Sequence, residues 1–271
     1  MQTSPLISII VPCYNQGKYL TECLNSVHSQ RYENYEIVVI NDGSTDAHTN
    51  KTVREISHPK VTVLQTENRG VSAARNRGIK NSTGRYILPL DADDKIGANF
   101  IQQAIEVLEK NEDIKVANCK VALFGTKNGI LPVETYSLEK LLARNFIVVS
   151  AIFRRSDFEQ TEGYNPNMRE GFEDWDFWIT LLKNGGAVHT LNDTGFFYRI
   201  KRNSRNASVI SNREHYRKLR HQIYLNHQNI YSKHLLDPQE SFEFELITQS
   251  REYKLGTILL KPIRTLYRLF H

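Results

Sequence analysis

The N-terminal half of the chain alternates short apolar runs with segments whose apolar residues recur at helical spacing. Four runs predict strands, at residues 6–11, 35–40, 61–65 and 86–90, and the continuous first run predicts a strand buried on both faces. After the first run, steps of three and four mark one face of a helix, at Leu20, Cys23, Leu24 and Val27. Strands that alternate with amphipathic helices predict an α/β fold, with a mostly parallel sheet and helices on both faces.

The second half of the chain has less regular elements. Its apolar runs predict strands at residues 116–124, 148–154, 187–191 and 195–201. One helix is predicted to begin near Glu173, because Trp175, Trp178 and Leu182 fall on one face, and another is predicted over residues 213–232. We therefore expect a main domain over residues 1–205 and a helical C-terminal extension over residues 206–271.

Composition places the chain among soluble globular proteins, since 40% of its residues are hydrophobic and 24% are charged. Three scattered cysteines, Cys13, Cys23 and Cys119, argue against a disulfide framework and against a structural zinc site. The N-terminus lacks the pattern of a secretory signal, and no apolar run reaches the roughly 20 residues that span a bilayer. These features together predict a cytoplasmic location.

Polar turns follow the first, second and fourth predicted strands, at residues 14–15, 41–42 and 91–94. Parallel strands place their carboxyl ends at one edge of a sheet, so we expect the three turns to share one crevice. In an open α/β fold, that crevice is where ligands bind. No glycine-rich phosphate loop follows the first strand, which disfavours simple dinucleotide dehydrogenases and P-loop NTPases.

The turn after the fourth strand carries three carboxylates within four residues: Asp91, Asp93 and Asp94. Carboxylates so close together repel one another and favour a nearby cation. Oxygen ligands suit a hard divalent ion, so we expect Mn²⁺ or Mg²⁺ here. A solvated acidic turn without a ligand is the alternative.

Five segments together resemble the inverting glycosyltransferases of family 2, which adopt the GT-A fold. In chain order they are residues 9–15 (IIVPCYN), 41–46 (NDGSTD), 68–76 (NRGVSAARN), 91–94 (DADD) and 173–175 (EDW). The resemblance covers about residues 6–200. It implies a nucleotide-sugar donor, usually a UDP-sugar, in a half formed by about residues 1–115. It also implies an acceptor half formed by about residues 116–205.

The resemblance assigns the nucleoside to the first two polar turns. It implies that Pro12, Tyr14 and Asp42 hold the nucleoside, with Tyr14 offering a ring face and Asp42 accepting from a base N–H. Asn15 belongs to the same donor-binding turn. From its position before the first helix, Asn15 is also expected to cap that helix.

The diphosphate is expected next to the three carboxylates. The resemblance implies that Asp93 binds the metal, that Asp91 lies on the ribose side or the metal side, and that Asp94 is a further possible ligand. The ion would neutralise the diphosphate as a leaving group. Arg75 and Asn76 are expected to support the diphosphate or the sugar, and a surface ion pair is the alternative for Arg75.

Inversion requires a base that deprotonates the acceptor hydroxyl. Glu173 and Asp174 match the acidic base motif of the family, and the resemblance implies that Asp174 is the base. The alternative is that both acids simply complement the positive end of a helix dipole.

Two departures from the family pattern refine this expectation. The chain lacks the Gln-x-x-Arg-Trp motif of processive members, which indicates transfer of a single sugar. It also lacks the metal-binding histidine that many relatives carry after the last core strand. Water would then complete the metal shell, or Arg199, Lys201 or Arg202 would meet the diphosphate. The four histidines at 215, 221, 227 and 234 lack metal-ligand spacing and are expected to be solvent-exposed.

Two other classes stay open at this point. A nucleotidyltransferase also uses a metal on an α/β sheet, but it would need a glycine-rich basic loop after the first strand. A non-catalytic sugar-nucleotide-binding protein is the second alternative. Nucleic acid is not an expected partner, because three acids in the cleft would repel its phosphates.

The last segment, residues 251–271, carries five basic residues against one acidic residue. Its apolar residues follow steps of three or four, so it reads as a basic amphipathic helix that lies on an anionic membrane surface. Pro262 is expected to kink this helix, and packing on the core or a dimer contact are the alternatives. On the membrane interpretation, the protein is peripheral on the inner face of the cell membrane. The acceptor is then a glycan or lipid-linked sugar, as in bacterial surface polysaccharide or glycolipid assembly.

Overall fold

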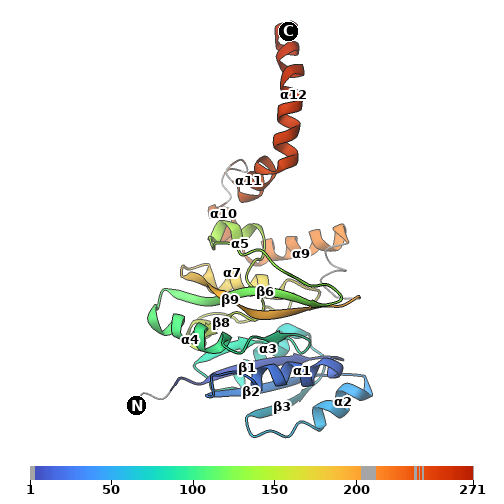
Figure 1. Ribbon diagram of the computed structural model, residues 1–271, viewed down its shortest axis with the longest axis vertical. Helices are drawn as coiled ribbons and strands as arrows, with labels where there is room; N and C mark the ends of the chain where they lie inside the picture. The colour runs from blue at the N-terminus through green and yellow to red at the C-terminus, as the bar shows by residue number, and fades with distance from the viewer. Residues whose placement is uncertain (1–3, 203–211, 235–236, 238, 240, 271) are drawn as a thin grey trace.

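The computed structural model describes residues 4–202, 212–234, 237, 239 and 241–270 (Figure 1). In this part of the chain, nine strands form one mixed sheet in the order β3-β2-β1-β4-β8-β6-β9-β5, and β7 pairs with β6. The strands are β1 (Ile7–Cys13), β2 (Tyr35–Asp42), β3 (Val61–Thr66), β4 (Tyr86–Pro89), β5 (Lys95–Ile96), β6 (Ile114–Gly125), β7 (Gly129–Ile130), β8 (Ile152–Arg154) and β9 (Ala187–Ile200).

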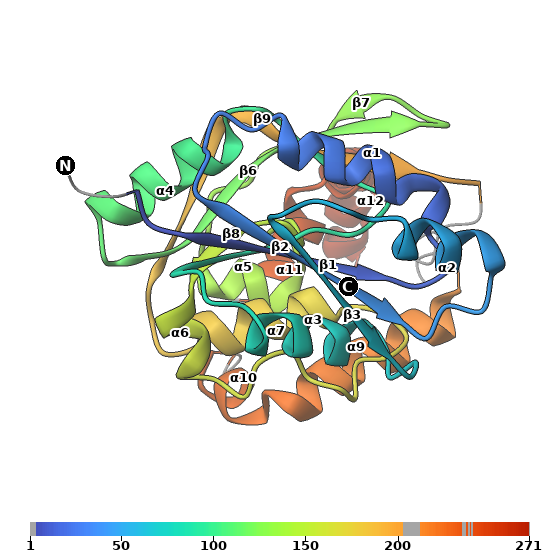
Figure 2. The same cartoon turned by 90° about the horizontal axis from the view of Figure 1, so that it is seen from below.

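The described residues include helices on both faces of this sheet and helices that lie beyond it. They are α1 (Gly17–His28), α2 (Ala47–Arg54), α3 (Val71–Lys80), α4 (Phe100–Lys110), α5 (Leu138–Ala143), α6 (Arg155–Glu159), α7 (Glu173–Leu182), α9 (Arg213–Asn226), α10 (Gln228–His234), α11 (Phe242–Gln249) and α12 (Arg251–Phe270). In Figure 2, α1 and α4 lie on one side of the sheet, and α3, α7 and α9 lie on the other. The predicted sheet with helices on both faces is therefore confirmed.

The first four strands form one parallel part of the sheet, and β6 and β9 form another. β1 lies between β2 and β4, and Ile7 is opposite both Tyr35 and Tyr86. β3 extends the sheet beyond β2 in the same direction. The carboxyl ends of β1, β2 and β4 consequently meet at one edge, as the sequence predicts.

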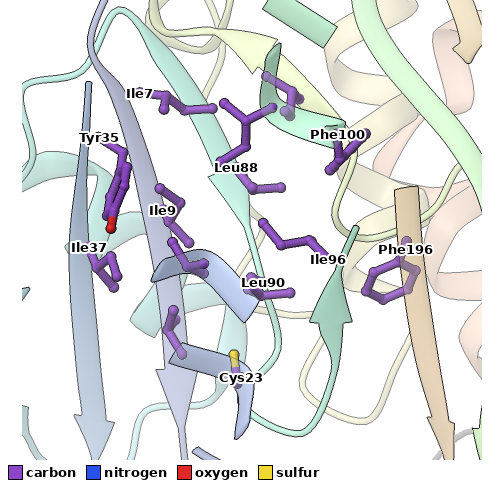
Figure 3. Close-up of a cluster of buried hydrophobic side chains, with 14 of the residues drawn as sticks. Ile7, Ile9, Cys23, Tyr35, Ile37, Leu88, Leu90, Ile96, Phe100 and Phe196 are labelled. Atoms are coloured by element: carbon purple, nitrogen blue, oxygen red, sulfur yellow. The ribbon is translucent and has the colours of Figure 1, made fainter. Parts of the chain in front are cut away.

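Two hydrophobic cores fill the space between the sheet and its helices. Figure 3 shows part of the first, which includes Ile9 of β1, Leu88 of β4, Phe196 of β9 and Cys23 of α1. The predicted inward face of α1 is confirmed, since all four of its apolar residues are buried. The second core, on the other face, includes Phe153, Trp178 and Ile223. Helix α3 belongs to this side and packs so closely that a Cβ atom at Gly78 would lie 2.5 Å from Ile10 Cγ2.

The region of residues 187–201 differs from the prediction. The sequence predicts two strands, but the structure has one, β9, which pairs with β6 along its length. The register with β6 shifts near Lys120, and residues 192 and 193 of β9 are exposed at that level. The strand thus continues through a β-bulge at the polar residues where the sequence predicts a break between two strands.

Asn15 does not cap α1. Its backbone has a φ of 54°, in the left-handed region that asparagine tolerates. Its side-chain oxygen accepts from the backbone N–H groups of Thr45 (2.8 Å) and Asp46 (3.1 Å), and Gln16 occupies the position before the helix. The capping prediction is therefore wrong, because the asparagine ties the β1 turn to the β2 turn instead.

The C-terminal helices differ from one another in how they contact the rest of the chain. The predicted helix over residues 213–232 is divided at His227 into α9 and α10, and Ile223, Ile230 and Tyr231 join the second core. α12 instead extends away from the body beyond α11 (Figure 1) and continues through Pro262. Among the described residues, no helix has the length and apolar character needed to cross a membrane.

His227 is 6% exposed, so the expectation of a solvent-exposed side chain is wrong for this histidine. Its Nε2 lies 3.0 Å from Oδ1 of Asp176 in α7, and Asn226 donates to the same oxygen at 2.6 Å. These bonds fasten α9 and α10 to α7.

His227→Ala should lower the free energy of unfolding by about 1–3 kcal/mol, because it leaves the buried Asp176 carboxylate with one partner fewer. Urea unfolding followed by circular dichroism measures this change. His221→Ala, at an exposed position of α9, is the control and should stay within about 0.5 kcal/mol of the wild type. Equal stability of the two variants would contradict a fastening role for His227.

Candidate active site

A cavity of about 600 Å³ opens at the edge where β1, β2 and β4 end. The beginning of α7 and the end of β9 complete its wall. The predicted site residues that line it are Pro12, Tyr14, Asp42, Asp91, Asp93, Asp94, Glu173 and Asp174. Acids from two distant parts of the sequence thus face one space.

The part of this cavity where the nucleoside is expected combines an exposed ring with a buried carboxylate. Tyr14 is 44% exposed and follows directly on β1. Asp42 is buried and accepts from the backbone N–H groups of Arg69 and Gly70, each at 3.0 Å. Gly70 has a φ of 87°, a conformation that glycine adopts without strain. Asp42 therefore orders the loop that begins α3, and it also lines a second, smaller cavity of about 260 Å³.

Asn15 and Asn76 lie outside the lining of the cavity. Asn76 uses both ends of its amide on one residue, accepting from Tyr164 N at 2.9 Å and donating to Tyr164 O at 2.7 Å. Through these hydrogen bonds, each asparagine fixes a turn near the cavity. The geometry does not support the prediction that Asn15 and Asn76 contact the donor.

Arg75 is fully buried next to the site, between two carboxylates. Its side chain is 0% exposed, so the alternative of a surface ion pair is wrong. One guanidinium nitrogen lies 2.6 Å from Asp91 Oδ1, and another lies 3.2 Å from Glu173 Oε1. The guanidinium also lies 5.3 Å from the ring centroid of Tyr164. Arg75 therefore bonds the carboxylates of the chain itself, and it joins the end of β4 to the beginning of α7.

Each of the three neighbouring aspartates has a different partner. Asp91 pairs with Arg75, and Asp93 Oδ2 lies 2.5 Å from Nζ of Lys201. Asp94 is buried, and its Oδ1 accepts the backbone N–H of Arg199 at 2.7 Å. Burial, together with the charges of Asp93 and Asp91, raises the pKa of Asp94 well above its ordinary value. Its Oδ2 has no hydrogen-bond partner among the described residues.

These residues fit a divalent ion only in part. Within the described part of the chain, no three acidic, histidine or cysteine side chains converge as a complete ligand set. Mg²⁺ sites commonly use one or two carboxylates, with substrate phosphates and water as the other ligands. Asp93, which lines the cavity, and the unpartnered Oδ2 of Asp94 supply oxygens of that kind.

The opposite wall carries the acidic pair at the beginning of α7. Glu173 is buried beside Arg75, whereas Asp174 is partly exposed to the cavity. Asn145 donates to Asp174 Oδ2 at 3.0 Å, and Trp175 N donates to Oδ1 at 2.8 Å. Burial and the charge of Glu173 raise the pKa of Asp174 to about 6. A carboxylate with that pKa is suited to accept a proton near neutral pH.

The sequence reasoning missed Asn145 and the part that Glu22 plays. Asn145 lies in a loop 29 positions before Asp174 and belongs to no motif. Glu22 pairs with both Lys95 and Arg199, so it orients the basic end of β9 from α1. Such long-range partners leave no periodic signal in the sequence.

The family model for glycosyl transferase family 2 matches residues 8–172. That span is more than half of the chain and holds both the aspartate cluster and the strands that carry it. The chain belongs to glycosyl transferase family 2. The predicted resemblance is thereby confirmed.

Two bacterial relatives illustrate the similarity within family 2. The uncharacterized glycosyltransferase RP339 of Rickettsia prowazekii is 40% identical over 192 residues, which are 66% of this chain and 59% of the relative. Glycosyltransferase GlyA of Streptococcus pneumoniae is 43% identical over 115 residues, or 41% of this chain and 16% of that protein. The chain therefore spans less than two thirds of the length of either relative.

Solved structures share the fold at low identity. Residues 1–349 of S. aureus TarS in complex with UDP-GlcNAc superpose with a TM-score of 0.67 at 21% identity, covering 92% of this chain and 77% of that one. The mannosyltransferase PcManGT from Pyrobaculum calidifontis, in complex with GDP-Man and Mn²⁺, gives 0.58 at 17% identity, covering 95% and 84%. These likenesses confirm the predicted GT-A fold.

Arg75→Met should lower the free energy of unfolding by about 3–5 kcal/mol, because Asp91 and Glu173 would lose the cation between them. Chemical denaturation measures the loss. Arg77→Met removes an exposed charge from the same helix and should change stability by no more than about 0.5 kcal/mol. An Arg75→Met protein as stable as this control would show that the two ion pairs contribute nothing to folding.

Proposed function

We propose that this chain transfers one sugar from a nucleotide-sugar, in the first instance a UDP-sugar, to an acceptor hydroxyl with inversion at the anomeric carbon. The proposal rests on one observation, which is that two walls with different functional groups face the same cavity. Tyr14 and Asp42 flank the donor side together with Asp93, and Asp174 faces them with a raised pKa. The TarS complex with UDP-GlcNAc supports a uridine nucleotide as the first donor to test.

In the proposed reaction, the acceptor oxygen attacks the anomeric carbon from the side of Asp174. The bond between that carbon and the diphosphate oxygen breaks, and the hydroxyl proton passes to the carboxylate of Asp174. Asn145 and the backbone N–H of Trp175 orient this carboxylate. Glu173 is held by Arg75, so we assign it a positioning role beside the base.

Donor binding is assigned to the other wall. Pro12 and Tyr14 contact the nucleoside, and Asp42 fixes the loop beside it. We propose that Asp93 holds Mn²⁺ or Mg²⁺, with Asp94 or Asp91 nearby. When bound, the ion neutralises the diphosphate that leaves with the electron pair.

The acceptor proposal rests on α12. Its exposed apolar side chains include Leu255, Ile258, Leu259 and Ile263, and its main contacts are with α11. Lys254 and Lys261 are exposed on the same helix. We propose that α12 lies on an anionic membrane at the cytoplasmic face. The acceptor would then be a glycan or lipid-linked sugar of bacterial surface polysaccharide or glycolipid assembly.

Asp174→Asn should lower transfer at least about a hundredfold while nucleotide affinity stays close to normal, because the change affects the acceptor proton and not the diphosphate. UDP release and calorimetric titration with UDP measure the two quantities. Release of UDP rather than pyrophosphate also separates glycosyl transfer from nucleotidyl transfer. Glu173→Gln is the control and should be the milder variant. If Glu173→Gln were inactive and Asp174→Asn active, Glu173 would be the base and Asp174 the positioning residue.

The wild-type pH profile tests the same assignment. The base works as a carboxylate, and its pKa is about 6. The kcat/KM for transfer should therefore rise about tenfold per pH unit below pH 6 and level off above it. A profile that is flat between pH 5 and 7 would contradict Asp174 as the base.

Removal of residues 252–271 should abolish sedimentation with anionic liposomes and leave donor hydrolysis in solution intact. Each basic residue near such a surface contributes about 1 kcal/mol, so the full chain with Lys254→Glu and Lys261→Glu should sediment less as well. Neutral liposomes are the matched control. Equal sedimentation of the full and shortened chains would sink the membrane proposal.

A further inference from the structure

The carboxylate proposed to bind the metal already has a cation. Lys201 Nζ lies 2.5 Å from Asp93 Oδ2, and the two side chains are 23% and 18% exposed. Both residues line the cavity. A divalent ion at Asp93 and an ammonium at the same oxygen repel each other, so they compete for one place.

Arg199, two residues earlier, is fixed by several contacts. Its Nε donates to the backbone oxygen of Asp93 at 2.7 Å, and it pairs with Glu22. Its guanidinium also lies 4.6 Å from the ring centroid of Tyr19 and 4.2 Å from that of Phe124. Displacing Arg199 would break all of these contacts together.

Lys201 is held much less firmly. Besides Asp93, its ammonium has a 3.4 Å contact with Gln16 Oε1 and lies 5.5 Å from the centroid of Tyr19. A lysine ammonium is a point charge on a flexible four-carbon stem, so it can turn to a new anion without a change in the backbone. The diphosphate of a donor in this cavity is such an anion.

We propose that Lys201 is the resident counter-ion of Asp93 in the donor-free enzyme, and that a divalent ion displaces it so that its ammonium turns to the diphosphate of the donor. The inference rests on the proposed function, in that it takes the ligand to be a nucleoside diphosphate bound with a metal. Two consequences follow. The metal alone binds weakly. Bound nucleotide raises the affinity for the metal by the same factor by which bound metal raises the affinity for the nucleotide.

The first experiment measures Mn²⁺ binding to the nucleotide-free chain by electron paramagnetic resonance of the unbound ion. Lys201→Met should bind Mn²⁺ at least about tenfold more tightly than the wild type, because the competing cation is gone. Lys201→Gln, which keeps a polar side chain, should show the same gain and guards against a folding defect in one variant. Asp93→Asn should bind weakly with either residue at position 201.

Lys95→Met is the matched control. Lys95 is a nearby lysine, and its ammonium lies 2.8 Å from Glu22 rather than at Asp93. Its removal lowers the net charge equally and should leave Mn²⁺ affinity within about twofold of the wild type. The proposal is overturned if the Lys201 variants gain no affinity, or if Lys95→Met gains as much as they do.

The second experiment titrates UDP by calorimetry, with and without Mn²⁺. In the wild type, Mn²⁺ should strengthen UDP binding, and in Lys201→Met this coupling should shrink by about fivefold or more, because no ammonium is released to the diphosphate. Unchanged coupling in Lys201→Met would overturn the movement of Lys201. Failure of both proteins to bind UDP with Mn²⁺ would instead count against the proposed donor, while the Mn²⁺ titrations alone still decide whether Lys201 competes for Asp93.

Discussion

One buried guanidinium holds the two walls of the cavity together. Arg75 lies between Asp91 and Glu173, two carboxylates that would repel each other at the contact of β4 and α7. Buried charges of this kind are tolerated only when they are paired and hydrogen-bonded. The same helix, α3, also carries Asn76, whose amide holds the backbone of Tyr164. α3 therefore connects the turn after β4 to the acidic pair at the beginning of α7.

Beside Arg75, the three aspartates of the turn after β4 lie in three different environments. Asp91 is held by Arg75 and Asp93 by a lysine, while Asp94 is buried against a backbone N–H with a raised pKa. The difference comes from what each carboxylate faces, because all three belong to one short turn. The three carboxylates are therefore not equivalent, since burial and the charges of its neighbours raise the pKa of Asp94.

The sequence predicts well what local pattern determines. Strands β1 to β4 and the inward face of α1 follow from apolar spacing, and the polar turns are placed correctly at one edge because parallel strands share a direction. The pairing of residues that lie far apart in the chain cannot be predicted from local pattern. Arg75 and Glu173 are 98 positions apart, so no local pattern signals their ion pair, and the burial of His227 depends on an acid in another helix. The position of a site residue was thus predictable, whereas its pairing was not.

The bulge opposite β6 has a consequence for how the site tolerates change. Side chains of an extended segment alternate between faces. Arg199 in β9 and Lys201, one residue beyond its end, are two positions apart, so both reach Asp93 from the same side. The register shift near Lys120 lies upstream of them and fixes which side that is. A single inserted or deleted residue between the bulge and position 199 would invert the phase of the strand and turn both basic groups away from the turn of aspartates. Insertions and deletions in this chain should therefore be tolerated only outside that short stretch of β9. The alternation of side chains along this one strand controls the charge balance of the whole cavity.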